Sequence, residues 1–237
     1  MSRRLGIATL GRQPYAETLE LQRTLCRLRL AGELEGDLLL LVEHDPVVTL
    51  GRGTRSTSLP LSLDELARRG VEVAEVERGG DVTYHGPGQL VGYPILQLQE
   101  HKADLHWYLR QLEATLISAL ERLGITAERR EGLTGVWTSG RKIASIGIHV
   151  KQWVTFHGFA LNVSTDLRGF DLIVPCGIHG VTMTSVAREL HREDDPLLWR
   201  ESRGEVVDAF QRVFGYSTSE PVDALALPVA QPRATPR

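Results

Sequence analysis

The sequence contains few cysteines and no long hydrophobic run, and each shortage excludes a class of protein. Two cysteines, Cys26 and Cys176, among 237 residues rule out a disulfide-rich scaffold and a zinc site built mainly from thiolates. The longest aliphatic run covers residues 38–42, whereas a helix needs about 20 apolar residues to span a bilayer. Because the first residues also lack the pattern of a secretory leader, we expect a cytoplasmic protein that is not bound to a membrane.

Basic residues, and lysines in particular, are also scarce. The 27 basic residues are outnumbered by 30 acidic ones, which gives a net charge of −3 and no general footprint for binding nucleic acid. The lysines are Lys102, Lys142 and Lys151, and arginine supplies the rest of the basic charge. Since lysine can lose its proton in a protein and arginine cannot, each lysine is a mild indication of a place where an amine is needed.

The remaining composition, 42% hydrophobic and 24% charged residues, is typical of a folded globular protein. Periodicity, capping residues and turn residues predict helices over residues 15–34, 62–70, 104–123 and 196–214, the last interrupted near Gly204. Short strands are predicted over residues 37–43, 47–50, 71–76, 125–130, 135–138, 142–153 and 154–163. Hairpin signals such as Ser139-Gly140 favour an α+β fold, with a mixed, mainly antiparallel sheet flanked by helices. We expect one domain over residues 1–217 and a proline-rich, flexible tail over residues 218–237.

Residues 78–94 form the densest unusual segment, with five glycines and two prolines among Arg, Asp, Thr, Tyr, His and Gln. Glycines let a ligand approach the backbone and its amides, although a glycine-rich surface turn is the structural alternative. The segment is not a dinucleotide-binding fingerprint, because the third glycine is missing, and no Gly-Lys-Ser/Thr follows as in a phosphate-binding loop.

Two further segments carry reactive side chains. Ser139 and Lys142 have the spacing of a serine–lysine hydrolase, but Gly140 and the strand-like alternation argue against the helix that this chemistry requires. Cys176 lies between proline and glycine and therefore in a turn, where its side chain can face a cleft or be a small buried hydrophobe. A zinc site at Cys176 and His179 lacks a second pair of ligands at finger-like spacing.

Pairing Cys176 with Lys142 would make the thiol reactive. A thiol with a pKa near ~8.5 is only about 3% thiolate at pH 7, and a shift of ~1.5 units, roughly 2 kcal/mol, makes half of it thiolate. A partly desolvated ammonium a few ångströms away can supply that energy and can also carry protons. The sequence separation permits this contact without establishing it.

Four motifs in one order resemble the octanoyltransferases of lipoate synthesis, also called lipoate–protein ligase B. They are RGGxxTYHGPGQ over residues 78–89, GRKIAxxG over 140–147, GFALNV over 158–163 and PCGI over 175–178. The resemblance extends from about residue 30 to about residue 217. It implies a fold like the catalytic domain of biotin and lipoate ligases, a class II synthetase-like fold.

The resemblance also implies an activity, which is transfer of an octanoyl group from acyl carrier protein to a lysine of a lipoyl domain or of the glycine-cleavage H protein. It implies that Cys176 is the nucleophile that carries the acyl group as a thioester and that Lys142 lowers the pKa of this thiol and handles protons. Neither metal, cofactor nor ATP is implied, and we expect a monomer. The residues that match the family's substrate-binding segments are Arg78, Gly79, Gly80, Asp81, Val82, Thr83, Tyr84, His85, Ser145, Ile146, Gly147, Gly158, Phe159 and Ala160.

Two other functions remain open at this point. An ATP-dependent lipoate or biotin ligase would share the fold and the lysine but would not need Cys176. A non-catalytic binding module for lipoyl domains or carrier protein would bind these partners without turnover.

Overall fold

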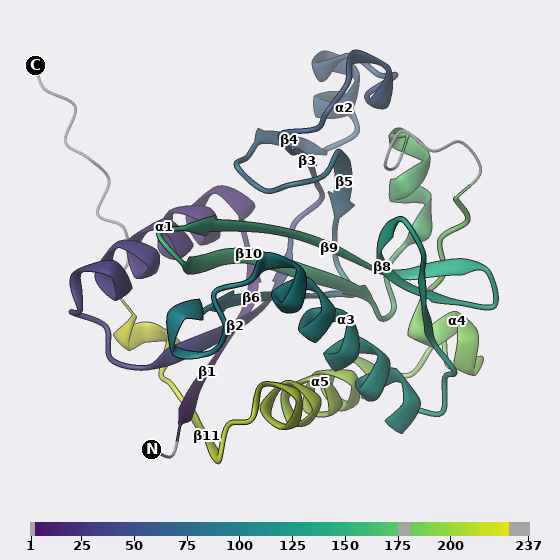
Figure 1. Cartoon of the computed structure of the whole chain (residues 1–237). Coiled ribbons are helices and arrows are strands. Elements are labelled where there is room, and N and C mark those ends of the chain that lie inside the picture. The colour runs from purple at the N-terminus through teal and green to yellow at the C-terminus, as the bar shows by residue number, and fades with distance from the viewer. Residues whose placement is uncertain (1–2, 175–180, 228–237) are drawn as a thin grey trace, which may run out of the picture.

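In the computed structural model, which describes residues 3–174 and 181–227, the strands form two sheets (Figure 1). The eight-stranded sheet has the order β11 (Thr218–Pro221), β1 (Arg4–Gln13), β2 (Asp37–His44), β6 (Gln89–Ile95), β10 (Val154–Asn162), β9 (Arg141–Lys151), β8 (Leu133–Thr138) and β7 (Glu128–Arg130). The three-stranded sheet has the order β4 (Glu72–Glu75), β3 (Val47–Leu50) and β5 (Val82–His85). In the large sheet, β1 is parallel to β2 and β11, and the other neighbours are antiparallel. The predicted α+β fold with a mixed, mainly antiparallel sheet is confirmed.

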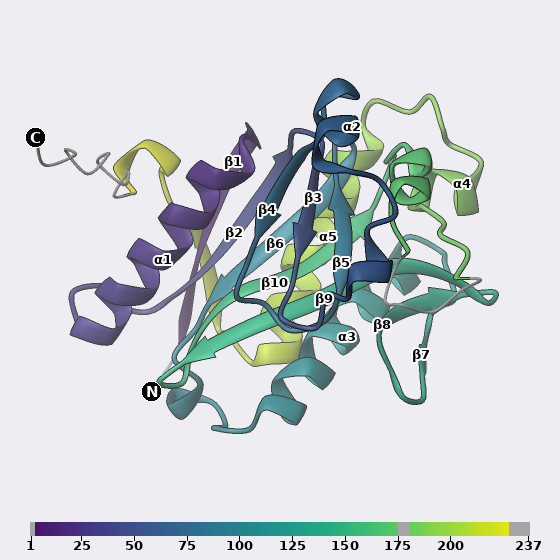
Figure 2. The same cartoon turned by 90° about the horizontal axis from the view of Figure 1, so that it is seen from above.

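Helices cover both faces of the large sheet, as Figures 1 and 2 show. Helix α1 (Tyr15–Ala31) packs on one face, and α3 (Leu105–Arg122) and α5 (Leu198–Phe214) pack side by side on the other. Two shorter helices, α2 (Leu63–Arg68) and α4 (Val186–Leu190), lie at the periphery of the molecule, as Figure 1 shows. Among the described residues, no helix is both long and apolar enough to cross a membrane.

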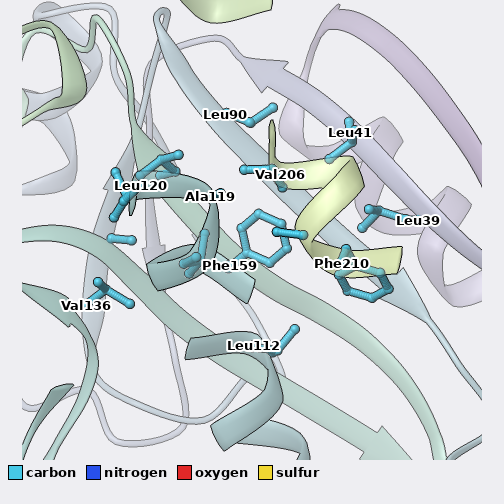
Figure 3. Packing of buried hydrophobic residues seen from close by; sticks show 14 of the residues in the cluster. Leu39, Leu41, Leu90, Leu112, Ala119, Leu120, Val136, Phe159, Val206 and Phe210 are labelled. Atoms are coloured by element: carbon cyan, nitrogen blue, oxygen red, sulfur yellow. The ribbon is translucent and has the colours of Figure 1, made fainter. Parts of the chain in front are cut away.

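Strand β2 explains the aliphatic run at residues 38–42, because both of its faces are buried. Leu39 and Leu41 point into the core formed with α3 and α5, which Figure 3 shows around Phe159 and Phe210. Leu38 and Leu40 point into the second core, formed with α1. A strand between two layers of helices therefore has no polar face.

Local signals place several element boundaries as predicted. Ser62 caps α2 by accepting a hydrogen bond from the Glu65 amide at 3.2 Å, and Asp104 caps α3 through the Trp107 amide at 3.0 Å. Ser139 and Gly140 have φ values of 45° and 82°, the left-handed pair that a two-residue hairpin requires. The expected interruption of the last helix at Gly204 is wrong, because α5 continues through this residue.

Strands β1, β5 and β6 were not predicted from periodicity. Gly92 and Pro94 argue against a central strand, yet β6 lies between β2 and β10. Pairing of β6 with β10 is interrupted after Gly92, where the Pro94 carbonyl accepts a hydrogen bond from the Thr155 hydroxyl at 2.6 Å. It resumes beyond Pro94, where the Thr155 amide donates to the Leu96 carbonyl at 2.9 Å. Proline is tolerated because the backbone ladder is interrupted at this point, on the side where its N–H is missing.

The first ten residues of the segment expected to be a flexible tail, 218–227, are part of the folded structure. Residues 218–221 form β11, which is parallel to β1, and Leu227 is buried in the core beneath α1. Edge pairing through the backbone does not depend on hydrophobic periodicity, so the sequence pattern contained no signal for this strand.

A buried carboxylate, that of Asp37, joins the segment just before β11 to the rest of the sheet. Asp37 accepts hydrogen bonds from the Tyr216 hydroxyl at 2.8 Å and the Gln97 amide at 3.1 Å. Its other partners are the His101 ring at 2.7 Å and the Arg29 guanidinium at 3.4 Å. One side chain at the start of β2 thus connects segments from both ends of the chain.

We expect Asp37→Ala to lower the free energy of unfolding by about 3–5 kcal/mol, because the buried partners lose their anion. The matched control is Asp45→Ala, which removes a half-exposed carboxylate paired with Arg12 at 2.7 Å and is expected to cost about 1 kcal/mol or less. Urea unfolding of the two variants measures both values. Equal losses would contradict the role of Asp37 as the central acceptor.

Candidate active site

A cavity of about 310 Å³ lies between the two sheets and collects most of the residues that the motifs single out. Lys142 is in its wall, together with the predicted substrate-binding residues Arg78, Gly80, Asp81, Val82, Thr83, His85, Ser145, Ile146, Gly147, Gly158, Phe159 and Ala160. Gly79 and Tyr84 are not in its lining. Cys176 lies within residues 175–180, outside the described residues.

The register of β9 and β10 brings two of the motifs together. Ser145, Ile146 and Gly147 lie opposite Ala160, Phe159 and Gly158, respectively. Positions far apart in the sequence therefore become direct cross-strand neighbours in one wall of the cavity.

Close approach of the loop before β5 explains Gly147 in this wall, and close approach of the neighbouring strand β6 explains Gly158. The Gly79 amide donates to the Ile148 carbonyl of β9 at 2.8 Å, which holds residues 78–81 against the strand. A Cβ atom on Gly147 would lie 2.9 Å from Arg78 Cδ, and one on Gly158 would lie 2.2 Å from the Gly92 oxygen. Larger side chains at these two positions would push the walls of the cavity apart.

The Arg78 guanidinium is buried and holds the loop in shape. It donates to the Thr49 carbonyl and hydroxyl of β3 at 2.7 and 2.8 Å, and to the Asp81 carbonyl at 2.7 Å. The Asp81 carboxylate in turn accepts from the Ser58 hydroxyl at 2.7 Å. These bonds fasten the small sheet to the loop that lines the cavity.

Tyr84 points away from the cavity, because side chains alternate along β5. Its ring packs edge-on against Phe170, with centroids 5.6 Å apart, in the apolar cluster behind the loop. Tyr84 thus stabilises the small sheet, whereas the next residue, His85, faces the cavity.

Lys142 is only 4% exposed, and its backbone is held from both sides. In β9 it lies opposite Trp137 of β8, and its ammonium lies 5.3 Å from the centroid of the Trp137 ring. On the other edge its amide donates to the Thr182 carbonyl at 2.8 Å, and its carbonyl accepts from the Thr184 amide at 2.9 Å. The strand therefore fixes where this amine can reach.

A chain of buried amides orients His85. Its Nδ1 lies 2.7 Å from the Gln89 side-chain oxygen, and the Gln89 amide nitrogen donates to Asn162 at 2.9 Å. Asn162 donates onward to the Thr184 carbonyl at 3.0 Å. Because Gln89 accepts, Nδ1 of His85 carries the hydrogen, and burial lowers the pKa of His85 to about 3. His85 is therefore a neutral imidazole whose Nε2 is the hydrogen-bond acceptor.

Sequence reasoning missed several lining residues, including Tyr15, Tyr93, Trp137 and His157. Tyr15 begins a helix, and the others lie in strands, so their patterns indicate only core packing. His157 did have a structural signal, because it adopts a left-handed φ of 56° inside β10, which is strained for a non-glycine residue. Burial lowers the pKa of His157, and its Nε2 lies 3.6 Å from a Glu77 oxygen.

Within residues 3–174 and 181–227, no group of three or more His, Cys, Asp or Glu side chains is placed to hold a metal ion. Several polar side chains of the cavity, among them Arg78, Asp81 and His85, instead bond to neighbouring side chains and to the backbone. Apolar side chains, including Val91, Phe159 and Phe170, complete the lining. The arrangement fits an apolar ligand with a polar, reactive end.

Known structures identify the class to which this fold belongs. A bipartite lipoate protein ligase from Thermoplasma acidophilum, described with its E2 lipoyl domain, matches with a TM-score of 0.72 and 17% identity, over 94% of this chain and 89% of that chain. Lipoate-protein ligase A bound with ATP matches with a TM-score of 0.70 and 17% identity, over 94% and 90% of the two chains. The fold is that of lipoate ligases.

The chain belongs to the lipoyl protein ligase A/B catalytic domain family, whose family model matches residues 14–211. A relative from Nostoc punctiforme, named octanoyltransferase, is 46% identical over 210 residues, 89% of this chain and 88% of that protein. Another octanoyltransferase, from Synechococcus elongatus, is 51% identical over 177 residues, 75% of each chain. The predicted family resemblance is confirmed.

The buried histidines beside the cavity predict a pH dependence of stability. Burial lowers the pKa of His44 to about 4, while a histidine in an unfolded chain titrates near ~6.5. Below pH ~6.5 the unfolded chain binds a proton that folded His44 does not, so stability falls as the pH drops toward 4. The slope from one such histidine is about 1.4 kcal/mol per pH unit.

We expect His44→Gln to flatten the loss of stability between pH 6.5 and 4 by up to about 3 kcal/mol. His106→Gln, at an exposed position, is the control and should leave the pH dependence unchanged. Urea unfolding at several pH values measures both. A wild-type stability that stays constant over this range would contradict the prediction.

Proposed function

We propose that this protein is an octanoyltransferase that moves an octanoyl group from acyl carrier protein to a lysine of a lipoyl domain or of the glycine-cleavage H protein. The proposal is supported by family membership and by relatives that carry the name octanoyltransferase. The observation that carries it is a cavity with an apolar lining and a nearly buried ammonium, that of Lys142, in its wall.

Cys176 is proposed as the nucleophile. Its thiolate attacks the thioester carbonyl of the octanoyl carrier protein, and the carrier's phosphopantetheine sulfur leaves as the acyl–Cys176 thioester forms. The amine of the acceptor lysine then attacks this thioester, the amide forms, and the Cys176 sulfur leaves. The first exchange is nearly isoenergetic and the second is downhill, so the sequence of steps needs no nucleotide, metal or other cofactor.

Lys142 is the proposed proton carrier in both steps. Its ammonium stabilises the Cys176 thiolate and protonates the departing carrier sulfur. The resulting amine accepts the proton that the acceptor lysine loses as the amide forms. The position of the chain on either side of residues 175–180 supports this pairing, because the Val174 amide donates to the Ser58 carbonyl at 2.9 Å and Val181 lines the cavity.

The proposed substrate-binding residues divide into two groups. The loop with Arg78, Gly80 and Asp81 is proposed to supply donors for the developing oxyanion, as such reactions require. Ile146 and Phe159, which pair across β9 and β10, offer apolar surface to the acyl chain. We propose further that the enzyme acts as a monomer in the cytoplasm, with the carrier protein and the lipoyl proteins as its partners.

Intact-mass spectrometry after mixing with octanoyl carrier protein tests the nucleophile. We expect the wild type to gain one octanoyl group that maps to Cys176, and Cys176→Ser to gain none. Cys26→Ser is the matched control, because burial in α1 raises the pKa of the Cys26 thiol and leaves it inert. An octanoyl group on any other residue would overturn the assignment.

The same assay separates the alternatives. The fold is shared with a lipoate ligase whose structure contains ATP. If free octanoate or lipoate with ATP supports full activity while octanoyl carrier protein does not, the protein is an ATP-dependent ligase. Binding of octanoyl carrier protein without any turnover would instead indicate a binding module.

Lys142→Arg tests the proton carrier. We expect a loss of activity of at least about 100-fold, even though the positive charge is kept, because a guanidinium does not give up its proton. Lys151→Arg, on an exposed residue at the far end of the same strand, should keep wild-type activity. Steady-state transfer assays with octanoyl carrier protein compare the two, and near-normal turnover in Lys142→Arg would remove the proposed role.

A further inference from the structure

The Lys142 ammonium faces the indole ring of Trp137, a residue outside every motif of the site. The two residues are cross-strand partners in β8 and β9, and both line the cavity. The ammonium lies 5.3 Å from the ring centroid, within the range of a cation–π interaction. With Trp137 only 2% exposed and Lys142 only 4%, water screens this attraction little.

The neighbouring part of β8 is shaped to receive the lysine side chain. Gly135 has a φ of 131°, and a Cβ atom on it would lie 2.9 Å from Lys142 Cε. The Gly135 amide donates to the buried Glu113 carboxylate of α3 at 3.4 Å. Arg110 and Arg129 hold that carboxylate at 2.6 and 2.9 Å. The Lys142 side chain thus passes directly over Gly135, where any larger residue would displace it, with the Trp137 ring beside it.

We propose that Trp137 is a positioning residue that keeps the Lys142 ammonium charged and holds it at the cavity wall. The inference rests on the proposed role of Lys142 in octanoyl transfer. A π-face attracts the ammonium and not the neutral amine, so the ring favours the protonated form between turnovers. It also limits the lysine rotamers, so that the proton is delivered from one place.

Other groups around the cavity do not obscure this effect. Among the residues that the structure describes, the titratable and charged side chains that line it with Lys142 are Tyr15, Arg78, Asp81, His85, Tyr93 and His157, and Glu113 faces it from α3 through Gly135. The Cys176 thiol, the proposed partner of Lys142, is present in the wild type and in every Trp137 variant, so the comparison between them isolates the ring. Burial lowers the pKa values of His85 and His157, so both are neutral above pH 7. Burial raises the pKa values of Tyr15 and Tyr93, so neither ionises before strongly alkaline pH.

The test is the pH–rate profile of octanoyl transfer for the wild type, Trp137→Phe, Trp137→Leu and Trp107→Leu. Without the ring the ammonium loses its proton more easily, so we expect the alkaline limb of Trp137→Leu to move to lower pH by about one unit. Trp137→Phe keeps a weaker π-face and should fall between Trp137→Leu and the wild type. Trp107→Leu, which removes a partly buried indole from α3, should leave the limb in place.

The outcomes test the role of Trp137 and the role of Lys142 separately. An unchanged alkaline limb in Trp137→Leu, or a shift of equal size in Trp107→Leu, would overturn the role of Trp137. If Trp137→Leu does not fold, the shift in Trp137→Phe decides instead. Lys142→Met is assayed in parallel: if it retains full activity, the proposed function of Lys142 fails, whereas an inactive Lys142→Met with an unshifted Trp137 series rejects only the inference made here.

Discussion

The buried guanidinium of Arg78 ties the small sheet to the loop that lines the cavity, and the Gly79 amide ties that loop to β9 of the large sheet through the Ile148 carbonyl. The bonds of Arg78 to Thr49 attach it to the small sheet, and its bond to the Asp81 carbonyl closes the loop that faces β9. Arginine suits this position because its planar fork satisfies several oxygens at once and stays charged when buried. The cavity therefore has a wall made of backbone, which approaches β9 closely only because Gly147 leaves the space.

Strand β9 contributes the amine that makes this cavity a candidate active site. It carries Lys142 near one end and Ser145–Gly147 a few residues later, and its register with β10 places Phe159 opposite Ile146. Each of its two edges at Lys142 is paired, one with β8 and one with the segment around Met183. Because the backbone at Lys142 is fixed on both sides, only the side-chain torsions remain to be ordered when its amine is positioned.

The site combines apolar packing with polar groups that are satisfied mostly by one another. His85, Gln89 and Asn162 form a continuous chain of hydrogen bonds from the cavity to the segment that pairs with Lys142. Burial keeps the histidine neutral, so the chain adds orientation without adding charge beside the ammonium. The cost of burying these groups is offset by their mutual bonds and by the cores on both faces of β2.

The sequence by itself determined what depends on neighbours along the chain: the caps at Ser62 and Asp104, the hairpin at Ser139-Gly140, the helices, and the motifs that mark the family. It did not determine β6, whose Pro94 is tolerated only because the ladder to β10 is interrupted there, nor the edge strand β11. The tertiary structure alone decided that Tyr84 turns away from the cavity and that Trp137 faces Lys142. The reason is physical: periodicity and turn chemistry act within a few residues, whereas strand register and packing across two sheets join residues that the chain keeps far apart.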